Sequence, residues 1–373
     1  MLIVRAPVRI SLAGGGTDLP AYFNQFGGVV INTTIDKYFY VFLRVYDGDS
    51  LQIASSDYST FYRQEPGMET DEVTVDGTLG LPRTILNTFG IHSGLSMFLA
   101  SEIPPGTGLG SSSTVTVAII KALTTALSEP VSKAELAELA CRIEIQEMGM
   151  PIGKQDQYAA AFGGLNEITF TAQECRVSPL ELPWETRQRL QDNLMLFFTG
   201  QARNSADILK QQTQASRTSS SSTVEALHRV KAMVDDVRDC FLRGDLDAFG
   251  QLLHENWMQK KRFAPGVSNS LIDESYETAR RLGAVGGKIT GAGGGGFLML
   301  YCERPFQPPV TEALERLGLR RMDFRFDSTG ARVLMNAGLS IQRTTAKRRT
   351  VSRGTGNGSV EARRLGQAQT VGN

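Results

Sequence analysis

Short apolar segments alternate with amphipathic ones along most of this chain of 373 residues. Apolar runs of strand length predict strands at residues 2–12, 52–54, 95–101, 165–170, 194–199 and 297–302, and a pair of strands within 29–45. Apolar positions that recur every three or four residues predict helices at about 115–127, 136–143, 204–215, 224–242, 246–260, 271–282 and 311–317. Strands and helices interleave in both halves, which predicts a mixed α/β or α+β fold.

Local signals near two segments refine this pattern. Ser132 and Glu135 have the spacing of a capping box, which predicts a helix that starts there and ends near Gly149. Residues 322–335 are expected to form a hairpin that turns at 327–330.

The chain is too long for one ordinary core and fits two domains of roughly 150 residues each. The alternating pattern breaks near residues 175–183 and then restarts. We therefore expect a first domain at 1–178, a second at 179–337 and a tail at 338–373.

Charge is balanced over the whole chain but not along it, because the tail holds seven basic residues against one acid and the body is correspondingly acidic. The tail is rich in Gly, Ser, Thr and Gln and lacks an apolar period, which is typical of disorder. A basic tail can bind nucleic acid or anionic lipid. No aromatic residue interrupts this one to stack on bases, so we do not expect nucleic acid as a partner.

Composition narrows the protein class, with 41% hydrophobic and 21% charged residues, as in soluble globular proteins. No apolar run approaches the roughly 20 residues that cross a bilayer, and the first residues lack a signal-peptide core. We expect a cytoplasmic protein without a membrane partner. The cysteines are far apart and in no metal spacing, which favours reduced thiols over disulfides or a zinc site: Cys141, Cys175, Cys240 and Cys302.

Residues 104–114 read Pro-Pro-Gly-Thr-Gly-Leu-Gly-Ser-Ser-Ser-Thr and lead directly into an apolar-periodic helix. The three glycines allow close backbone approaches, so that successive N–H groups can converge on a ligand oxygen. The hydroxyls that follow lie where the helix leaves its first N–H groups unpaired and its dipole positive. This pattern predicts an anion-binding loop whose ligand is phosphate, and a merely flexible loop is the alternative.

Two further glycine loops occur at residues 9–20 and 288–296. Neither has the spacing of a P-loop or of a dinucleotide-binding fingerprint. A tight connection between strands explains each loop about as well as ligand contact does. Three such loops in one chain favour ligand binding.

Three motifs of this chain resemble those of the galactokinase, homoserine kinase, mevalonate kinase and phosphomevalonate kinase (GHMP) superfamily. They are Pro7-Val8-Arg9 through Asp18, residues 104–114 and residues 288–296, and the resemblance extends over roughly residues 1–336. Within it, Ala13-Gly14-Gly15-Gly16-Thr17-Asp18 and residues 153–164 resemble the branch of D-glycero-D-manno-heptose 7-phosphate kinases and L-fucokinase domains. The resemblance implies a ribosomal-S5-like first domain, a ferredoxin-like second domain, and a sugar kinase site between them that uses ATP and Mg²⁺.

The resemblance also implies which residues bind ATP and the metal. The nucleotide contacts would be Pro104, Gly106, Thr107, Gly108, Leu109, Gly110, Ser111, Ser112 and Ser113, with Gly293 and Gly294 from the last loop. Mg²⁺ prefers oxygen ligands, here Ser112 and Glu144, with Glu147 as the alternative to Glu144. A solvated helix acid is the other interpretation of Glu144.

For catalysis, the resemblance implies that Asp156 accepts the proton of the sugar hydroxyl, assisted by the fixed positive charge of Arg9. A helix N-cap is the alternative role for Asp156. The implied sugar contacts are Asp18, Gly16 and Thr17. Arg203 is a candidate contact to a phosphate on the acceptor or to the γ-phosphate of ATP, and Lys154 is either a second contact to an anionic acceptor or a surface lysine.

The favoured acceptor is D-glycero-D-manno-heptose 7-phosphate, phosphorylated on its anomeric hydroxyl. An L-fucokinase or another sugar 1-kinase is the first alternative. A catalytically silent sugar-binding regulator is the second. The sequence leaves open whether the protein is a monomer or a homodimer.

Overall fold

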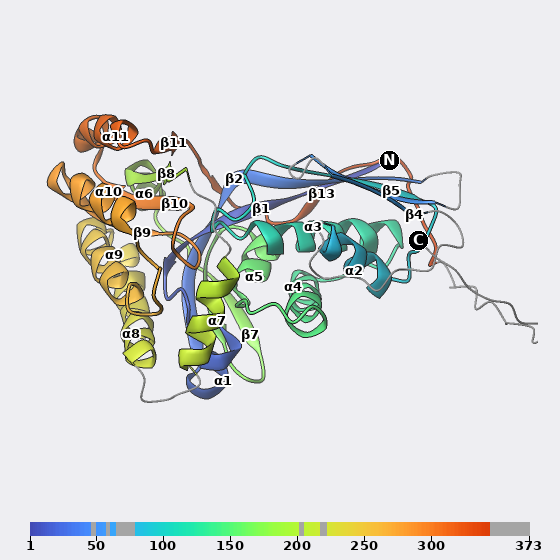
Figure 1. The fold of residues 1–373 in the computed structure, drawn as a ribbon, viewed down its shortest axis with the longest axis horizontal. Coiled ribbons are helices and arrows are strands. Elements are labelled where there is room, and N and C mark those ends of the chain that lie inside the picture. The colour runs from blue at the N-terminus through green and yellow to red at the C-terminus, as the bar shows by residue number, and fades with distance from the viewer. Residues whose placement is uncertain (46–49, 57–59, 65–78, 201–204, 217–221, 344–373) are drawn as a thin grey trace, which may run out of the picture.

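Two β-sheets, each with its own helices, build the molecule (Figure 1). This computed structural model describes residues 1–45, 50–56, 60–64, 79–200, 205–216 and 222–343. Within these ranges, one sheet has nine strands and the other four. The predicted mixed α+β fold is confirmed. In the described part of the chain, no helix is both long enough and apolar enough to cross a membrane.

The larger sheet is ordered β13-β1-β2-β5-β3-β4, with β6 and β12 also paired to β2, and β7 paired to β6. Its strands are β1 (Leu2–Ala13), β2 (Gly28–Val45), β3 (Leu51–Ser55), β4 (Thr60–Gln64), β5 (Leu95–Ser101), β6 (Leu165–Phe170), β7 (Cys175–Pro179), β12 (Phe326–Asp327) and β13 (Arg332–Asn336). The smaller sheet is antiparallel, in the order β11-β8-β10-β9, with β8 (Leu194–Phe198), β9 (Ala284–Ile289), β10 (Phe297–Cys302) and β11 (Arg320–Met322).

The helices fall into two groups along the chain. The first group is α1 (Pro20–Phe26), α2 (Gly80–Thr88), α3 (Ser111–Ala126), α4 (Lys133–Cys141), a π-helical turn (Arg142–Glu147) and α5 (Gln155–Phe162). The second group is α6 (Trp184–Asn193), α7 (Ser205–Ser216), α8 (Ser222–Arg243), α9 (Leu246–Lys260), α10 (Ser270–Arg281), a 3₁₀ turn (Arg304–Phe306) and α11 (Gln307–Arg316).

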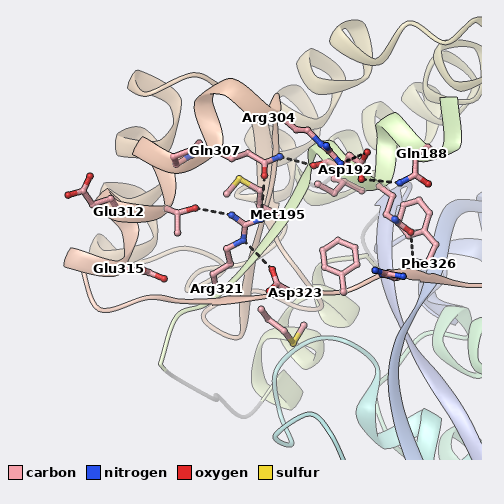
Figure 2. A pocket seen from close by; sticks show the side chains of 17 residues that line it. Gln188, Asp192, Met195, Arg304, Gln307, Glu312, Glu315, Arg321, Asp323 and Phe326 are labelled. Atoms are coloured by element: carbon pink, nitrogen blue, oxygen red, sulfur yellow. Dashed lines mark hydrogen bonds and ion pairs between the residues drawn. The ribbon is translucent and has the colours of Figure 1, made fainter. Parts of the chain in front are cut away.

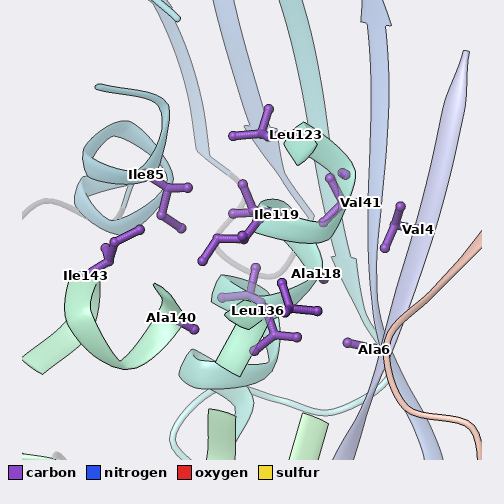
Figure 3. Packing of buried hydrophobic residues seen from close by; sticks show 14 of the residues in the cluster. Val4, Ala6, Val41, Ile85, Ala118, Ile119, Leu123, Leu136, Ala140 and Ile143 are labelled. Carbon is purple, nitrogen blue, oxygen red and sulfur yellow. The ribbon is translucent and has the colours of Figure 1, made fainter. Parts of the chain in front are cut away.

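Helix α3 lies at the centre of the first core. Figure 3 shows Ile119 of α3 between the strand that carries Val41 and the helices that carry Ile85 and Leu136. Helix α4 begins at the predicted capping box, because the Glu135 N–H donates to Ser132 Oγ and the Ser132 N–H donates to the Glu135 carboxylate. The packing of α3 in the first core fixes the N-terminus of this helix, which follows the glycine-rich loop directly.

A second core lies where the two sheets meet. Apolar side chains of β1 share one buried cluster with side chains of β8 and β10 and of helices α8 and α9: Val8, Ile10, Leu12, Leu196, Met299, Val234 and Phe249. The other face of the smaller sheet packs against α10 and α11 in a third cluster. The shared core holds the end of β1 and its following loop against the second sheet.

Two predicted strand arrangements are wrong. Residues 29–45 form one continuous strand, β2, because neither glycine nor proline interrupts them. Its first half pairs with β6 and its second half with β5. Residues 322–335 do not pair with each other, since β12 pairs with β2 and β13 pairs with β1 of the larger sheet.

The beginning of the predicted tail is ordered against the first core. Leu339 is 7% exposed and belongs to the first cluster, and the Ile341 N–H donates to the Ala126 carbonyl at the end of α3. Arg343 forms an ion pair with Glu129 at 2.6 Å. Residues 344–373 lie outside the described residues, and the expectation of a disordered tail from residue 338 onward was wrong for residues 338–343.

Candidate active site

All three glycine loops open onto one cavity of about 500 Å³. Its walls come from the end of β1, the loop after it, the loop before α3, residues 150–156, and the segment 288–292, with contributions from α7 and the end of α9. Loops that are far apart in the sequence therefore line one space, as their resemblance to family motifs implied.

The loop before α3 has the backbone that a phosphate site requires. Gly106, Gly108 and Gly110 all have positive φ, at 73°, 78° and 82°. A Cβ on Gly108 would lie 2.7 Å from the carbonyl oxygen of Thr290, and one on Gly110 would lie 3.0 Å from Asp156 Oδ2. Glycine at these two positions lets the loop approach both the last glycine motif and the candidate base.

The N-terminus of α3 faces this cavity. The helix starts at Ser111, its N-cap residue Gly110 provides no side-chain cap, and its first turn contains no acid. The first N–H groups of a helix lack intrahelical partners and form the positive end of its dipole. Ser111, Ser112 and Ser113 line the cavity at this end, so an anion there would meet both N–H groups and hydroxyls.

Most of the predicted nucleotide contacts line the cavity, and four do not. Pro104 and Leu109 point elsewhere: the Pro104 carbonyl accepts from Thr107 Oγ1, and Leu109 is buried in the core between the sheets. Gly293 and Gly294 lie against Val267, whose carbonyl accepts from the Gly294 N–H at 2.8 Å.

Arg9 and Asp156 form a close ion pair in the cavity. Arg9 Nε lies 2.7 Å and a terminal guanidinium nitrogen 2.6 Å from the same carboxylate oxygen, Asp156 Oδ1. The other terminal nitrogen of Arg9 donates to the Gly108 carbonyl at 2.7 Å. Arg9 therefore connects the candidate base to the glycine-rich loop, and Asp156 Oδ2 is not held by the guanidinium.

Glu144 lies behind Ser112, fully buried in the π-helical turn that continues α4. Ser112 Oγ donates to Glu144 Oε1 at 3.0 Å, and Gln157 Nε2 donates to Oε2 at 2.7 Å. Burial raises the pKa of Glu144 to about 7, although these hydrogen bonds favour its charged form. The alternative ligand, Glu147, instead accepts from Thr88 and pairs with Arg142.

Asp18, in the loop after β1, is held by two backbone N–H donors. Its Oδ1 accepts from the Gly16 N–H at 3.0 Å and its Oδ2 from the Gln155 N–H at 3.2 Å. Burial, and then the charge of Asp156, raise the pKa of Asp18. Gly16 and Asp18 both line the cavity, whereas Thr17 is buried and its hydroxyl bonds the carbonyls of Gly14 and Val29.

Of the two predicted contacts to an acceptor phosphate, Lys154 lies away from the cavity and Arg203 is not described. Lys154 Nζ donates to both Glu138 carboxylate oxygens at 3.1 and 3.2 Å, and Lys154 does not line the cavity. Its contact with an acceptor phosphate stays a prediction. Arg203 lies outside the described residues.

Several residues that line the cavity are not among those that the sequence marked as candidates. The most notable are Lys260 and Lys288, both buried, and Gln212 and Phe263, which touch the loop at Gly16. Lys288 stands immediately before the last glycine motif, so its position was the available signal. Nothing in the local pattern around Lys260 distinguished it from a solvated residue at a helix end.

A larger hollow of about 1090 Å³ lies between α6, α11 and β11 (Figure 2). Two ion pairs lie within its lining, Arg304 with Asp192 at 2.7 Å and Arg321 with Asp323 at 3.5 Å. None of the glycine loops reaches it. The smaller cavity is therefore the candidate active site.

Sequence comparisons match both halves of the chain. Residues 79–164 match the domain described as GHMP kinases N terminal domain, and residues 237–317 match GHMP kinases C terminal. The chain is 30% identical over 340 residues to D-glycero-alpha-D-manno-heptose 7-phosphate kinase of Campylobacter jejuni, covering 88% of this chain and 97% of that protein. It is 27% identical over 338 residues to L-fucokinase/L-fucose-1-P guanylyltransferase of Bacteroides fragilis, covering 81% of this chain and 34% of that protein.

Solved structures agree with the sequence comparisons. A D-glycero-D-manno-heptose 1-phosphate kinase from Bacteroides thetaiotaomicron superposes with a TM-score of 0.74 at 29% identity, covering 90% of this chain and 99% of that one. Galactokinase of Lactococcus lactis, complexed with galactose, has a TM-score of 0.68 at 19% identity, with 89% and 94% covered. The second match shows the shared fold alone.

Proposed function

Because the chain belongs to the GHMP kinase family, whose members are ATP-dependent kinases, we propose that it phosphorylates D-glycero-D-manno-heptose 7-phosphate on the anomeric hydroxyl. The relative named D-glycero-alpha-D-manno-heptose 7-phosphate kinase, matched over 97% of its length, supports this acceptor. The solved structure named as a heptose 1-phosphate kinase, matched over 99% of its length, supports the broader class of heptose phosphates. The observation that carries the chemistry is the Arg9–Asp156 pair, which lies beside the open N-terminus of α3.

The glycine-rich loop and α3 would bind the phosphates of ATP. Successive N–H groups at Ser111, Ser112 and Ser113 have no intrahelical acceptor and lie at the positive end of the helix dipole. Phosphoryl transfer depends mainly on positioning and on neutralising charge, so such a preorganised cradle supplies much of what the reaction needs.

Asp156 would take the proton of the attacking hydroxyl. Its Oδ1 is held by Arg9, which leaves Oδ2, near Gly110, to accept that proton as the hydroxyl oxygen bonds to the γ-phosphorus and ADP leaves. The guanidinium of Arg9 would stabilise negative charge on the transferring phosphoryl. Asp18, held by two backbone N–H groups, keeps its outer lone pairs for acceptor hydroxyls.

The residues behind the loop fit a bound Mg²⁺, which would neutralise charge on the ATP phosphates. Glu144 is a fully buried carboxylate with no basic partner among the described residues, and Ser112 places a hydroxyl oxygen 3.0 Å from it. A buried carboxylate without a counter-charge is costly, so this pair suits a cation with additional ligands from phosphate and water. No group of three or more His, Cys, Asp or Glu side chains in the described ranges could hold a metal by itself.

The acceptor assignment is tested by comparing three sugars. Purified protein with ATP and Mg²⁺ is assayed for ADP release with D-glycero-D-manno-heptose 7-phosphate, the same heptose without phosphate, and L-fucose. We expect the heptose 7-phosphate to have the highest kcat/KM and the product to carry phosphate on the anomeric carbon. Preference for L-fucose would instead support the fucokinase alternative, and absence of turnover with all three would support a silent sugar-binding protein.

A sugar phosphate acceptor and ATP agree with the cytoplasmic location that the sequence predicts.

A further inference from the structure

Lys260 and Lys288 line the candidate active site, yet the mechanism above does not use them. Lys260 ends α9 and is 8% exposed, and Lys288 lies in β9 and is 3% exposed. Lysine is rarely buried without a partner, because removing an ammonium from water is costly. Two such residues in one cavity therefore need an explanation.

Only backbone carbonyls hold these ammonium groups in the described part of the chain. Lys260 Nζ donates to the carbonyls of Ile289 and Gly291, each at 2.6 Å, and Lys288 Nζ donates to the Leu12 carbonyl at 3.3 Å. An ammonium group has three N–H donors. Within these residues, one donor of Lys260 and two of Lys288 are left without a protein acceptor.

Among the residues that the structure describes, the cavity has more basic than acidic side chains. Its lining cations are Arg9, Lys260 and Lys288, and its lining carboxylates are Asp18 and Asp156. Asp156 is already paired with Arg9. Burial, and then the charges of Lys288 and Arg9, lower the pKa of Lys260 well below its usual value.

The unused donors lie near the phosphate loop. The two carbonyls bound by Lys260 flank Thr290, whose hydroxyl donates to the Thr107 carbonyl of that loop at 3.2 Å. A further polar atom lining this cavity, Ser11 Oγ, is buried without a hydrogen-bond partner among the described residues. An unpartnered hydroxyl and three unused N–H donors suit a ligand with several acceptor oxygens.

We propose that Lys260 and Lys288, with Ser11, form a subsite for a phosphate dianion. A dianion would supply the acceptors that these groups lack and would offset the mutual repulsion of the cations. The phosphate belongs either to the acceptor or to the end of the ATP chain. The assignment of this phosphate to the acceptor rests on the proposed function, whereas the existence of the subsite does not.

The test measures binding to Lys260→Met and Lys288→Met variants, because methionine keeps most of the length and removes the charge. Lys231→Met is the matched control: Lys231 also donates to a backbone carbonyl, that of Phe26, but does not line the cavity. Ligands titrated by calorimetry are inorganic phosphate, ADP, a non-hydrolysable ATP analogue, heptose 7-phosphate and the unphosphorylated heptose.

We expect each cavity variant to weaken binding of the occupying phosphate by roughly 10- to 150-fold, the effect of losing one charge-assisted hydrogen bond. If the acceptor supplies the phosphate, binding of heptose 7-phosphate falls and that of the unphosphorylated heptose does not. If ATP supplies it, binding of the ATP analogue falls and that of ADP does not. In either case, inorganic phosphate binds the wild type more tightly than the variants.

The inference is overturned if the cavity variants bind every phosphate ligand as the Lys231→Met control does. It is also overturned if ADP and the unphosphorylated heptose weaken as much as the other ligands, which would indicate a general structural role. Should Lys260→Met fail to fold, Lys288→Met decides, because it leaves a single carbonyl without its donor. Failure of the proposed function would be seen in a separate measurement, because the wild type would then not phosphorylate heptose 7-phosphate.

Discussion

Replacing Gly153 by alanine should displace the carboxylate of Asp18. A Cβ at residue 153 would lie 1.9 Å from Asp18 Oδ2 and 2.5 Å from its Cγ. Gly153 is not among the glycines with positive φ, so alanine itself is compatible with the backbone there. To relieve this overlap, the Asp18 carboxylate must move by about 1.5 Å, so that its Oδ2 lies at an ordinary contact distance near 3.5 Å from the new Cβ.

Such a shift breaks at least one of the two hydrogen bonds that hold Asp18. These are the Gly16 N–H to Oδ1 at 3.0 Å and the Gln155 N–H to Oδ2 at 3.2 Å. A hydrogen bond to a charged group contributes about 1.5 to 3 kcal/mol. If Asp18 binds the acceptor, loss of its position should lower kcat/KM for the acceptor by roughly 10- to 150-fold. The overpacking should also lower the free energy of unfolding by about 1 to 3 kcal/mol.

The assay is steady-state kinetics with varied acceptor, together with a titration of ATP binding. We expect kcat/KM for the acceptor to fall while the dissociation constant of ATP stays close to that of the wild type. The double variant provides the control: once Asp18 is alanine, the carboxylate is gone, and Gly153→Ala should have little further effect. A full effect of Gly153→Ala in the Asp18→Ala background would refute the reasoning, as would a normal kcat/KM in the single variant.

Three further predictions concern the metal, the tail and pH. Glu144→Gln should raise the Mg²⁺ concentration needed for the half-maximal rate, because it removes the charge of a proposed ligand; an unchanged requirement would place the ligand elsewhere. Truncation after Arg343 should leave the urea midpoint nearly unchanged, whereas truncation after Ala337 should cost about 1.5 to 3 kcal/mol, since it removes the buried Leu339; equal midpoints would contradict this. Burial lowers the pKa of Lys288 to about 7, so above pH 7 the unfolded chain binds the additional proton and ligand-free stability should rise with pH. Between pH 7 and 9 the contribution of Lys288 to this rise should be about 2 kcal/mol, because the slope reaches about 1.36 kcal/mol per pH unit only above the folded pKa, and Lys288→Met should remove that contribution; an equal rise in the variant would contradict the assignment.

Features with a local cause could be predicted from the sequence. Helix α3 follows from its apolar period, and the glycine-rich loop before it follows from glycines that allow positive φ and close backbone approach. The capping box at Ser132 likewise depends on residues three positions apart. These signals were sufficient to locate one wall of the candidate site.

Features that depend on distant partners could not be predicted. The strands near Phe326 and Arg332 pair with the larger sheet, a choice that no local pattern encodes. Lys154 is held by Glu138, a residue of another helix, and so lies outside the cavity. Lys260 reaches the cavity only because α9 packs beside β9, which brings its ammonium to the last glycine motif.

The central claim is that phosphoryl transfer takes place at the Arg9–Asp156 pair, with Asp156 as the proton acceptor. The most direct measurement is the single-turnover rate of Asp156→Asn with saturating ATP and an acceptor that the wild type phosphorylates. Asparagine keeps the volume of the side chain but cannot serve as the base, so the rate should fall at least roughly 100-fold while ATP binds normally. A rate within about twofold of the wild type would contradict the account.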